Sequence, residues 1–155
     1  MRYIDTHAHY NDEVYNGVLD EYLTDSINKF VEKIINVSFN LESSISSIEL
    51  SHKYDYIYCA IGFHPSEVKF YDEDLLVSLL NDDKIVGIGE IGLDYHYGSD
   101  DSALQKEVFI KQINIARKYN LPVIIHSRDA SFDTYNIVNE YCKRFKGFIS
   151  LFCSY

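Results

Sequence analysis

Short apolar runs and longer amphipathic segments alternate along the whole of this 155-residue chain. The apolar runs are rich in Ile, Val, Tyr and Phe, and they predict β-strands at Tyr3–Thr6, Lys33–Ser38, Tyr56–Gly62, Ile85–Glu90, Pro122–His126 and Phe148–Phe152. The segments between them predict helices at Leu19–Phe30, Leu41–His52, Glu73–Asn81, Ser102–Tyr119 and Asp129–Phe145. Because strands that alternate with helices form parallel sheets with helical crossovers, the sequence predicts an α/β fold.

Two architectures fit this order of elements: a doubly wound sheet and most of a TIM-type (β/α)8 barrel. A complete barrel takes about 250 residues, so the barrel interpretation implies that its last strands are absent from this chain. No repeat, low-complexity tract or linker divides the sequence, which predicts a single domain over residues 1–155. The helix at Ser102–Tyr119 has the clearest signal, because Ser102 and Gln105 have the spacing of a capping box.

The charge balance limits the partners of such a domain. The 14 Lys and Arg residues against 24 Asp and Glu residues give a net charge of -10. This sign disfavours sequence-independent coating of nucleic acid, which needs a basic surface. It is compatible with an enzyme that holds phosphates through divalent metal ions, because the ions supply local positive charge.

Nothing in the sequence indicates a membrane segment. The longest apolar stretch, Tyr56–Phe63, is far shorter than the roughly 18 to 20 apolar residues of a membrane helix, and Asp5 and His7 interrupt any amino-terminal signal sequence. These features predict a cytoplasmic protein with no membrane partner. The cysteine spacing matches neither a disulfide framework nor a zinc ribbon, so we expect buried or free thiols at Cys59, Cys142 and Cys153.

Two histidines close the segment Asp5-Thr6-His7-Ala8-His9, which contains the end of the first predicted strand. Residues two apart on an extended strand point to the same side, so His7 and His9 can present two imidazoles to one metal ion. A His-x-His pair alone is weak evidence, and surface or hydrogen-bonded histidines are the alternative. The position near the carboxyl end of a parallel strand, where such sheets keep their active sites, favours metal binding.

A carboxylate, Glu90, ends the fourth predicted strand. Because an unpaired carboxylate is costly to bury, we expect Glu90 to contact a metal ion or a basic partner, and a carboxylate can also bridge two ions. A salt bridge to a lysine at the rim of the sheet is the alternative. Asp94, in the loop that follows, either orients a ligand or a water or forms a simple turn or helix cap.

The fifth predicted strand ends in the polar run His126-Ser127-Arg128-Asp129. His126 is placed to face the strand ends. The planar guanidinium of Arg128 suits a phosphate, with a salt bridge to a nearby acid as the alternative. For Asp129 we favour the cap of the following helix.

The third predicted strand leads into Gly62-Phe63-His64-Pro65, which places His64 at the same end of the sheet as the other candidates. Four strands that each deliver a His or a Glu to one rim are hard to explain as coincidence. His52, at the end of a helix, and His96, in a loop, have no such placement. We therefore expect these two histidines on the surface.

Four segments carry these residues, in the order Asp5–His9, Gly62–Pro65, Ile88–Tyr95 and Leu121–Ala130. Together they resemble the signature motifs of the TatD family of metal-dependent deoxyribonucleases. The resemblance covers the whole chain, although the chain matches only the first part of the family's barrel. It implies a (β/α)8 metallohydrolase, related to the amidohydrolase superfamily, that cleaves phosphodiester bonds in DNA with divalent ions such as Mg, Mn or Zn.

The resemblance also implies a role for each candidate. His7 and His9 resemble the ligands of one metal ion, Glu90 the carboxylate shared between two ions, and His126 a ligand of the second. His64 and Arg128 resemble groups that line the phosphate-binding pocket, so Glu90, His64 and Arg128 form the expected catalytic set. Water activated by the two ions is the implied nucleophile.

The sequence departs from the family pattern near its end. The family's sixth strand ends in a His-Cys-Phe-Ser-Gly sequence whose histidine completes the second metal site, and Ser150 stands at that position here. A hydroxyl is a poorer ligand than imidazole, so the second site is expected to be weakened or lost. Ser66 replaces a second histidine that often follows the family's His-Pro pair. An aspartate that a late strand supplies lies beyond Tyr155, and the unusual Ser150–Tyr155 tail suggests a frameshift.

Three hypotheses follow. The first is a TatD-like deoxyribonuclease in an incomplete form, and the second is a catalytically impaired remnant that binds metal weakly or folds against another chain. The third is an amide or lactone hydrolase, which we rank lower because Arg128 and His64 suit a phosphate. An open sheet leaves an unpaired edge, so we also expect self-association through it.

Overall fold

The computed structural model describes residues 2–98, 100–142 and 149–154. Its strands form one parallel sheet in sequence order, namely β1 (Tyr3–Ala8), β2 (Val31–Val37), β3 (Ile57–Ile61), β4 (Ile85–Asp94), β5 (Val123–Arg128) and β6 (Ile149–Ser154). In a doubly wound sheet the strand order reverses, so this sequential order identifies a (β/α)8-type barrel. Within the described residues β1 and β6 are the two edges, and the barrel is incomplete.

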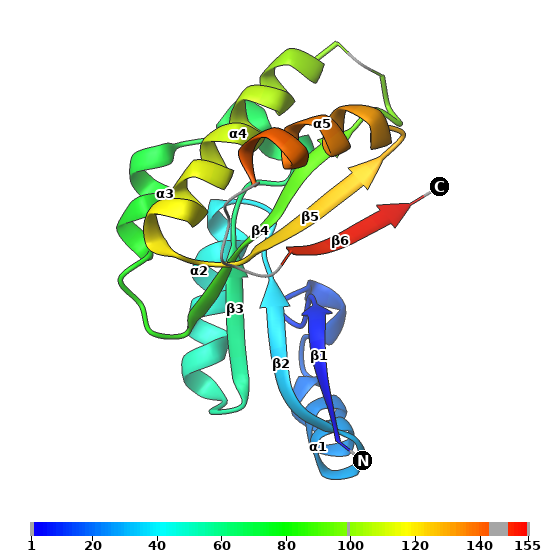
Figure 1. The fold of residues 1–155 in the computed structure, drawn as a ribbon. Coiled ribbons are helices and arrows are strands. Elements are labelled where there is room, and N and C mark those ends of the chain that lie inside the picture. Colours follow the sequence, from blue (N-terminus) through cyan, green and yellow to red (C-terminus); the bar gives the residue numbers. More distant parts are fainter. Residues whose placement is uncertain (1, 99, 143–148, 155) are drawn as a thin grey trace.

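Helices connect the strands, and α2 to α5 lie along one side of the curved sheet (Figure 1). The predicted helices are all present. The helix at Ser102–Tyr119 has the predicted bounds, and the ends of the others differ from the prediction by a few residues. The predicted end of the last helix, at Phe145, lies outside the described residues. The helices are α1 (Leu19–Lys29), α2 (Leu41–Lys53), α3 (Glu73–Leu79), α4 (Ser102–Tyr119) and α5 (Ser131–Tyr141), with short 3-10 helices η1 (Glu13–Tyr15) and η2 (Pro65–Phe70).

The main core lies between the sheet and α3 to α5. Its largest fully buried side chains include Phe63 after β3 and Phe109 on α4, packed with the isoleucines of β3, β4 and β5. A smaller cluster of Val37, Ala60 and Ile124 lies apart from this core. Beside it is an apolar pocket of about 300 Å³ whose lining comes from β1 to β5 and includes Ala60 and Ile124. Apolar burial on the helical side holds the elements that carry the candidate site.

Strand β4 is longer than predicted. It was expected to end at Glu90, but it continues to Asp94, so Glu90 lies inside the strand and Asp94 at its end. The pairing register between β4 and β5 shifts between Ile88 and Ile91, and the backbone N–H of Glu90 donates instead to the carbonyl of Ser38, at 2.7 Å. Because of this irregularity, Glu90 lies outside the regular hydrogen-bonded pairing of β4 with β5.

Two predicted helix caps are wrong. Helix α4 begins after Asp101 with no side-chain cap, because the Gln105 side chain bonds the backbone of Asp94 instead. Asp129 does not cap α5, whose N-cap residue is Ala130. Asp129 has a positive φ of 51°, and its carboxylate accepts a hydrogen bond from His96 Nδ1 at 2.9 Å.

Other predictions about single residues are confirmed. His52 and His96 are exposed at the surface, where each pairs with an aspartate. Cys59 is a buried free thiol and Cys142 a half-buried one, whereas the Cys153 side chain lies outside the described part. None of the described helices has both the length and the apolar character needed to cross a membrane.

Candidate functional site

The histidines of the first strand face each other. His7 is in β1 and His9 directly follows it, and their Nε2 atoms lie 3.2 Å apart. His9 Nδ1 lies 2.8 Å from the carbonyl oxygen of Val37 in β2. A carbonyl can only accept, so Nδ1 carries the proton and the Nε2 lone pair of His9 points toward His7.

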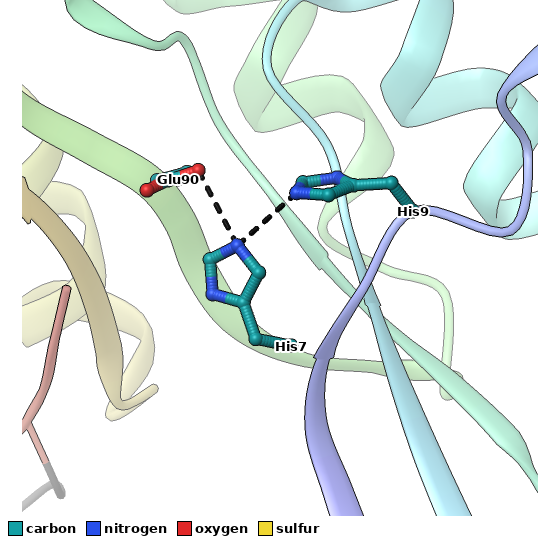
Figure 2. Close-up of side chains that lie close together, drawn as sticks. All are labelled: His7, His9 and Glu90. Carbon is teal, nitrogen blue, oxygen red and sulfur yellow. Dashed lines mark hydrogen bonds and ion pairs between the residues drawn. The ribbon is translucent and has the colours of Figure 1, made fainter. Parts of the chain in front are cut away.

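Glu90 joins these histidines from β4, as Figure 2 shows. Its side chain is buried, and Oε2 lies 3.4 Å from His7 Nε2. The other carboxylate oxygen, Oε1, lies 3.3 Å from Nδ1 of His126 in β5. The carboxylate therefore lies between the histidines of β1 and the histidine of β5, as a bridging ligand would.

A second group of possible ligands surrounds His126. Asp94 Oδ2 lies 2.9 Å from His126 Nε2, and the rings of His64 and His126 make an edge contact with centroids 4.4 Å apart. One ligand atom from each of His64, Asp94 and His126 lies within 4.8 Å of the other two, and the same holds for His7, His9 and Glu90. The described residues thus present two adjacent groups of metal-ligand type, and we call them the first and the second cluster.

A close approach of β4 and β5 makes this arrangement possible. Gly92 has a φ of 145°, and a Cβ at this position would lie 2.0 Å from the carbonyl oxygen of His126. No side chain fits there. The glycine lets β4 pass close to β5 between Glu90 and Asp94, the two carboxylates that reach His126.

The first cluster fits a divalent ion. Two nitrogens that are each about 2.1 Å from one ion lie roughly 3 to 3.4 Å apart at coordination angles between about 90° and 109°. The 3.2 Å between the Nε2 atoms of His7 and His9 falls in that range. Imidazole nitrogen with carboxylate oxygen is a donor set for Zn, Mn or other first-row metals.

Electrostatics also favour a bound cation near Glu90. Burial opposes ionisation of this carboxyl, but its hydrogen bonds with His126 and His7 outweigh burial and hold its pKa well below the usual range. Burial likewise opposes protonation of His126, yet hydrogen bonds with Glu90 and Asp94 raise its pKa. Burial and the neighbouring His126 lower the pKa of His64 to about 4, so His64 is neutral at pH 7.

A pocket of about 500 Å³ opens beside the second cluster and is lined by His64, Asp94, His126 and Arg128, among others. The Arg128 guanidinium carbon lies 5.4 Å from the ring centre of Tyr97. Arg128 Nε is buried and has no hydrogen-bond partner among the described residues. A buried N–H donor without a partner can donate to an oxygen of a bound anion.

Residues 4–153 match the family described as TatD related DNase. The chain belongs to this family. A relative named uncharacterized metal-dependent hydrolase YabD, from Bacillus subtilis, is 42% identical over 139 residues, which are 88% of this chain and 54% of the relative. YcfH of Escherichia coli, with the same description, is 32% identical over 144 residues, 90% of this chain and 54% of the relative.

Solved structures of TatD proteins have the same fold. The TatD homologue YjjV from Escherichia coli superimposes with a TM-score of 0.81 at 30% identity, over 90% of this chain and 56% of YjjV. A TatD family hydrolase from Entamoeba histolytica gives a TM-score of 0.80 at 28% identity, over 92% of this chain and 55% of that structure. The chain spans about half the length of the TatD relatives it matches.

The residues that the TatD motifs suggested lie together, in or shortly after β1, β3, β4 and β5. His7, His9 and Glu90 form the first cluster, His64 and His126 belong to the second, and Arg128 lines the adjoining pocket. Ser66, which follows the His64-Pro65 pair, lies with its Oγ 2.9 Å from Nδ1 of His64. The backbone of Ser150 pairs with Ile124, and its side chain lies outside the described part.

Sequence reasoning left three contributors unassigned. Asp94 was weighed between a ligand-orienting and a turn role, and it contacts His126 directly. Gln105 was interpreted as part of a cap, and Gln112 was not singled out. Both bond the backbone beside the site, at Asp94 and at Phe63. The sequence carries no local signal for such contacts, because the partners lie 11 and 49 residues away.

Proposed function

We propose that this chain carries the metal-binding half of a metal-dependent hydrolase that cleaves phosphodiester bonds in DNA. The observation that carries the proposal is the position of Glu90, whose two carboxylate oxygens reach His7 on one side and His126 on the other. A buried carboxylate between two histidine groups can bridge two adjacent divalent ions.

His7, His9 and Glu90 would hold one ion, and Glu90 with His126 the other. Mg, Mn or Zn bound there would supply positive charge to a phosphate oxygen and make water more acidic. His9 is preset for this role, because its Nδ1 proton is held by the Val37 carbonyl and Nε2 keeps its lone pair.

The pocket beside the second cluster would receive the phosphate. Arg128 offers paired donors to two phosphate oxygens, and its unpartnered Nε supports such a contact. His64 is neutral at pH 7 because its pKa lies near 4, so it can donate to a phosphate oxygen without adding a charge. A net charge of -10 favours few, local contacts to DNA over a wide basic surface.

The test measures nucleotide release from single-stranded DNA by the 155-residue chain with Mg or Mn, beside Glu90→Ala and the control Glu140→Ala. Glu140 is exposed on α5 and belongs neither to the two clusters nor to the lining of the adjoining pocket. We expect metal-dependent release that Glu90→Ala lowers by about 100-fold or more and Glu140→Ala leaves unchanged. Release that needs no metal, or that is equal in all three proteins, would refute the proposal.

A second candidate is a metal-binding chain that does not cleave DNA. Ser150 favours it, because a hydroxyl is a poorer metal ligand than the imidazole that the family motif implies at this position. Metal binding that depends on Glu90, with no release of nucleotides at any metal concentration, would select it. Turnover of an amide or a lactone but not of DNA would select the amidohydrolase alternative.

A further inference from the structure

Helix α4 directs two buried carboxamides toward the candidate site. Gln105 is 6% exposed and Gln112 is fully buried. The two residues are seven positions apart, which is about two helical turns, so they lie on the same face of the helix. A core-facing helix has no need of amides at such positions, because apolar side chains would fill them at no desolvation cost.

Gln112 is bonded to the peptide groups of a single residue, Phe63. The backbone N–H of Phe63 donates to Gln112 Oε1 at 2.8 Å, and Gln112 Nε2 donates to the Phe63 carbonyl at 3.0 Å. Phe63 lies just beyond β3 and directly precedes His64. The paired bonds therefore fix the backbone on the amino side of His64.

Gln105 makes the same pair of bonds with Asp94. The N–H of Asp94 donates to Gln105 Oε1 at 2.9 Å, and Gln105 Nε2 donates to the Asp94 carbonyl at 2.9 Å. The Asp94 carboxylate lies 2.9 Å from His126 Nε2. Gln105 thus holds the backbone of the carboxylate that contacts His126.

The two amides act on two of the three members of the second cluster. His64 follows β3 and Asp94 ends β4, and each is fixed through the backbone by one glutamine of the same rigid helix. All four of these bonds go to Phe63 and Asp94, beside the second cluster. In the first cluster, His9 is held by Val37, whose carbonyl oxygen lies 2.8 Å from His9 Nδ1.

We propose that Gln105 and Gln112 are positioning residues that set the spacing of His64 and Asp94 around His126. Helix α4 serves as the template for this spacing, since both amides project from it. The proposal deepens the proposed function and rests on it for the metal ion, but the positions of the side chains can be measured without metal.

The test uses the full chain with Gln105→Met, Gln112→Met and the control Asn114→Leu. Methionine keeps the length and bulk of glutamine and removes the hydrogen bonds. Asn114 is an exposed amide on the same helix. Three quantities are measured in each protein: amide hydrogen exchange at Phe63 and Asp94, the nuclear Overhauser contact between the His64 and His126 rings, and the affinity for Mn or Co ions.

We expect Gln112→Met to speed exchange at Phe63 by about 10-fold or more and to abolish the ring contact. Gln105→Met has the matching effect on exchange at Asp94. Each variant lowers the affinity for the ion at His126 by about 10- to 100-fold. The affinity for the ion at His7 and His9 stays unchanged. Asn114→Leu matches the wild type in all three measurements.

Faster exchange with an unchanged ring contact and unchanged metal affinity would overturn the proposal, because the glutamines would then only satisfy backbone groups. If a methionine variant does not fold, Gln112→Glu or Gln105→Glu replaces it, since glutamate keeps the acceptor and removes the donor. If the wild type binds no ion, the proposed function fails, and the ring contact alone decides whether the glutamines position the site.

Discussion

The Glu90 carboxylate lies 3.3 Å from His126 Nδ1, while His126 Nε2 lies 2.9 Å from Asp94. Both ring nitrogens of His126 therefore face carboxylates, and this explains why the His126 pKa is raised although the ring is half-buried. If one of these nitrogens bound a metal ion, the other would stay bonded to a carboxylate. That pairing of a ligand histidine with an acid fixes the ring and strengthens it as a donor.

If the proposed function is right and two ions bind, each ion can be lost separately. His9→Ala removes a ligand of the first cluster only, and His126→Ala one of the second only, so each variant should bind one ion fewer than the wild type. Glu90→Ala, which removes the group between them, should weaken both by about 10-fold or more. Calorimetric titration with Mn or Zn measures the stoichiometry. Identical stoichiometry in His9→Ala and His126→Ala proteins and the wild type would contradict the two-cluster description.

Arg128 should act on substrate binding more than on metal binding. Arg128→Ala removes a charged donor to a phosphate, and we expect KM for a phosphodiester to rise by about 10- to 100-fold with unchanged metal affinity. Arg128→Lys keeps the charge but not the paired geometry, so it should recover only part of this loss. Arg117→Ala, at an exposed position of α4, is the control. Steady-state kinetics check the prediction, and an unchanged KM in Arg128→Ala would refute it.

Asn36 should be a stability determinant of the loop after β1. This fully buried residue accepts a hydrogen bond from the Tyr10 N–H at 2.6 Å and donates to Asn11 and Ser47, both at 2.8 Å. Asn36→Ala leaves these partners unsatisfied and should lower the free energy of unfolding by about 1 to 3 kcal/mol. Urea unfolding measures the change, with the exposed Asn139→Ala as control. Equal stability of the two variants would show that the network contributes nothing.

The sequence alone predicts those parts of the site that depend on local patterns, and it misses contacts between residues far apart in the chain. The alternation of strand residues places His7 and His9 on one side, and the strand order brings Glu90 and His126 to the same rim. Strand β4 was predicted to end at Glu90 but continues to Asp94, and Gly92 allows its close approach to β5. The Gln112 contact with Phe63 spans 49 residues, and no local pattern encodes it.

Cys59 and Cys142 should differ in their reactivity toward alkylating reagents. Burial raises the pKa of Cys59 to about 12, and burial also raises the pKa of the half-buried Cys142. The thiolate is the reactive form, so at pH 8 Cys59 should resist alkylation in the folded protein. Cys142 is more accessible and should react first. Mass spectrometry of alkylated peptides with and without urea checks this order, and rapid native labelling of Cys59 would contradict the packing around it.

Self-association is the last prediction, and it follows from the open sheet. Within the described residues β1 and β6 are unpaired edges, and the apolar pocket of about 300 Å³ lined by Ile35 and Ile124 lies on the inner side. Open edges and apolar inner surface favour pairing between chains. We expect a mass above 18.0 kDa in light scattering at micromolar concentration.

The variant Ile35→Lys tests whether chains associate through the open strand edges or through the apolar inner side of the sheet. A lysine on the inner side would oppose apolar packing there, so this variant should be monomeric while its helical signal stays unchanged. Thr24→Lys, on the exposed surface of α1, adds the same charge elsewhere and serves as the control. If the variant stays associated like the control, the edges alone mediate the contact. If the wild type is a monomer at every concentration, the chain satisfies its open sheet without a second copy, and the prediction is wrong.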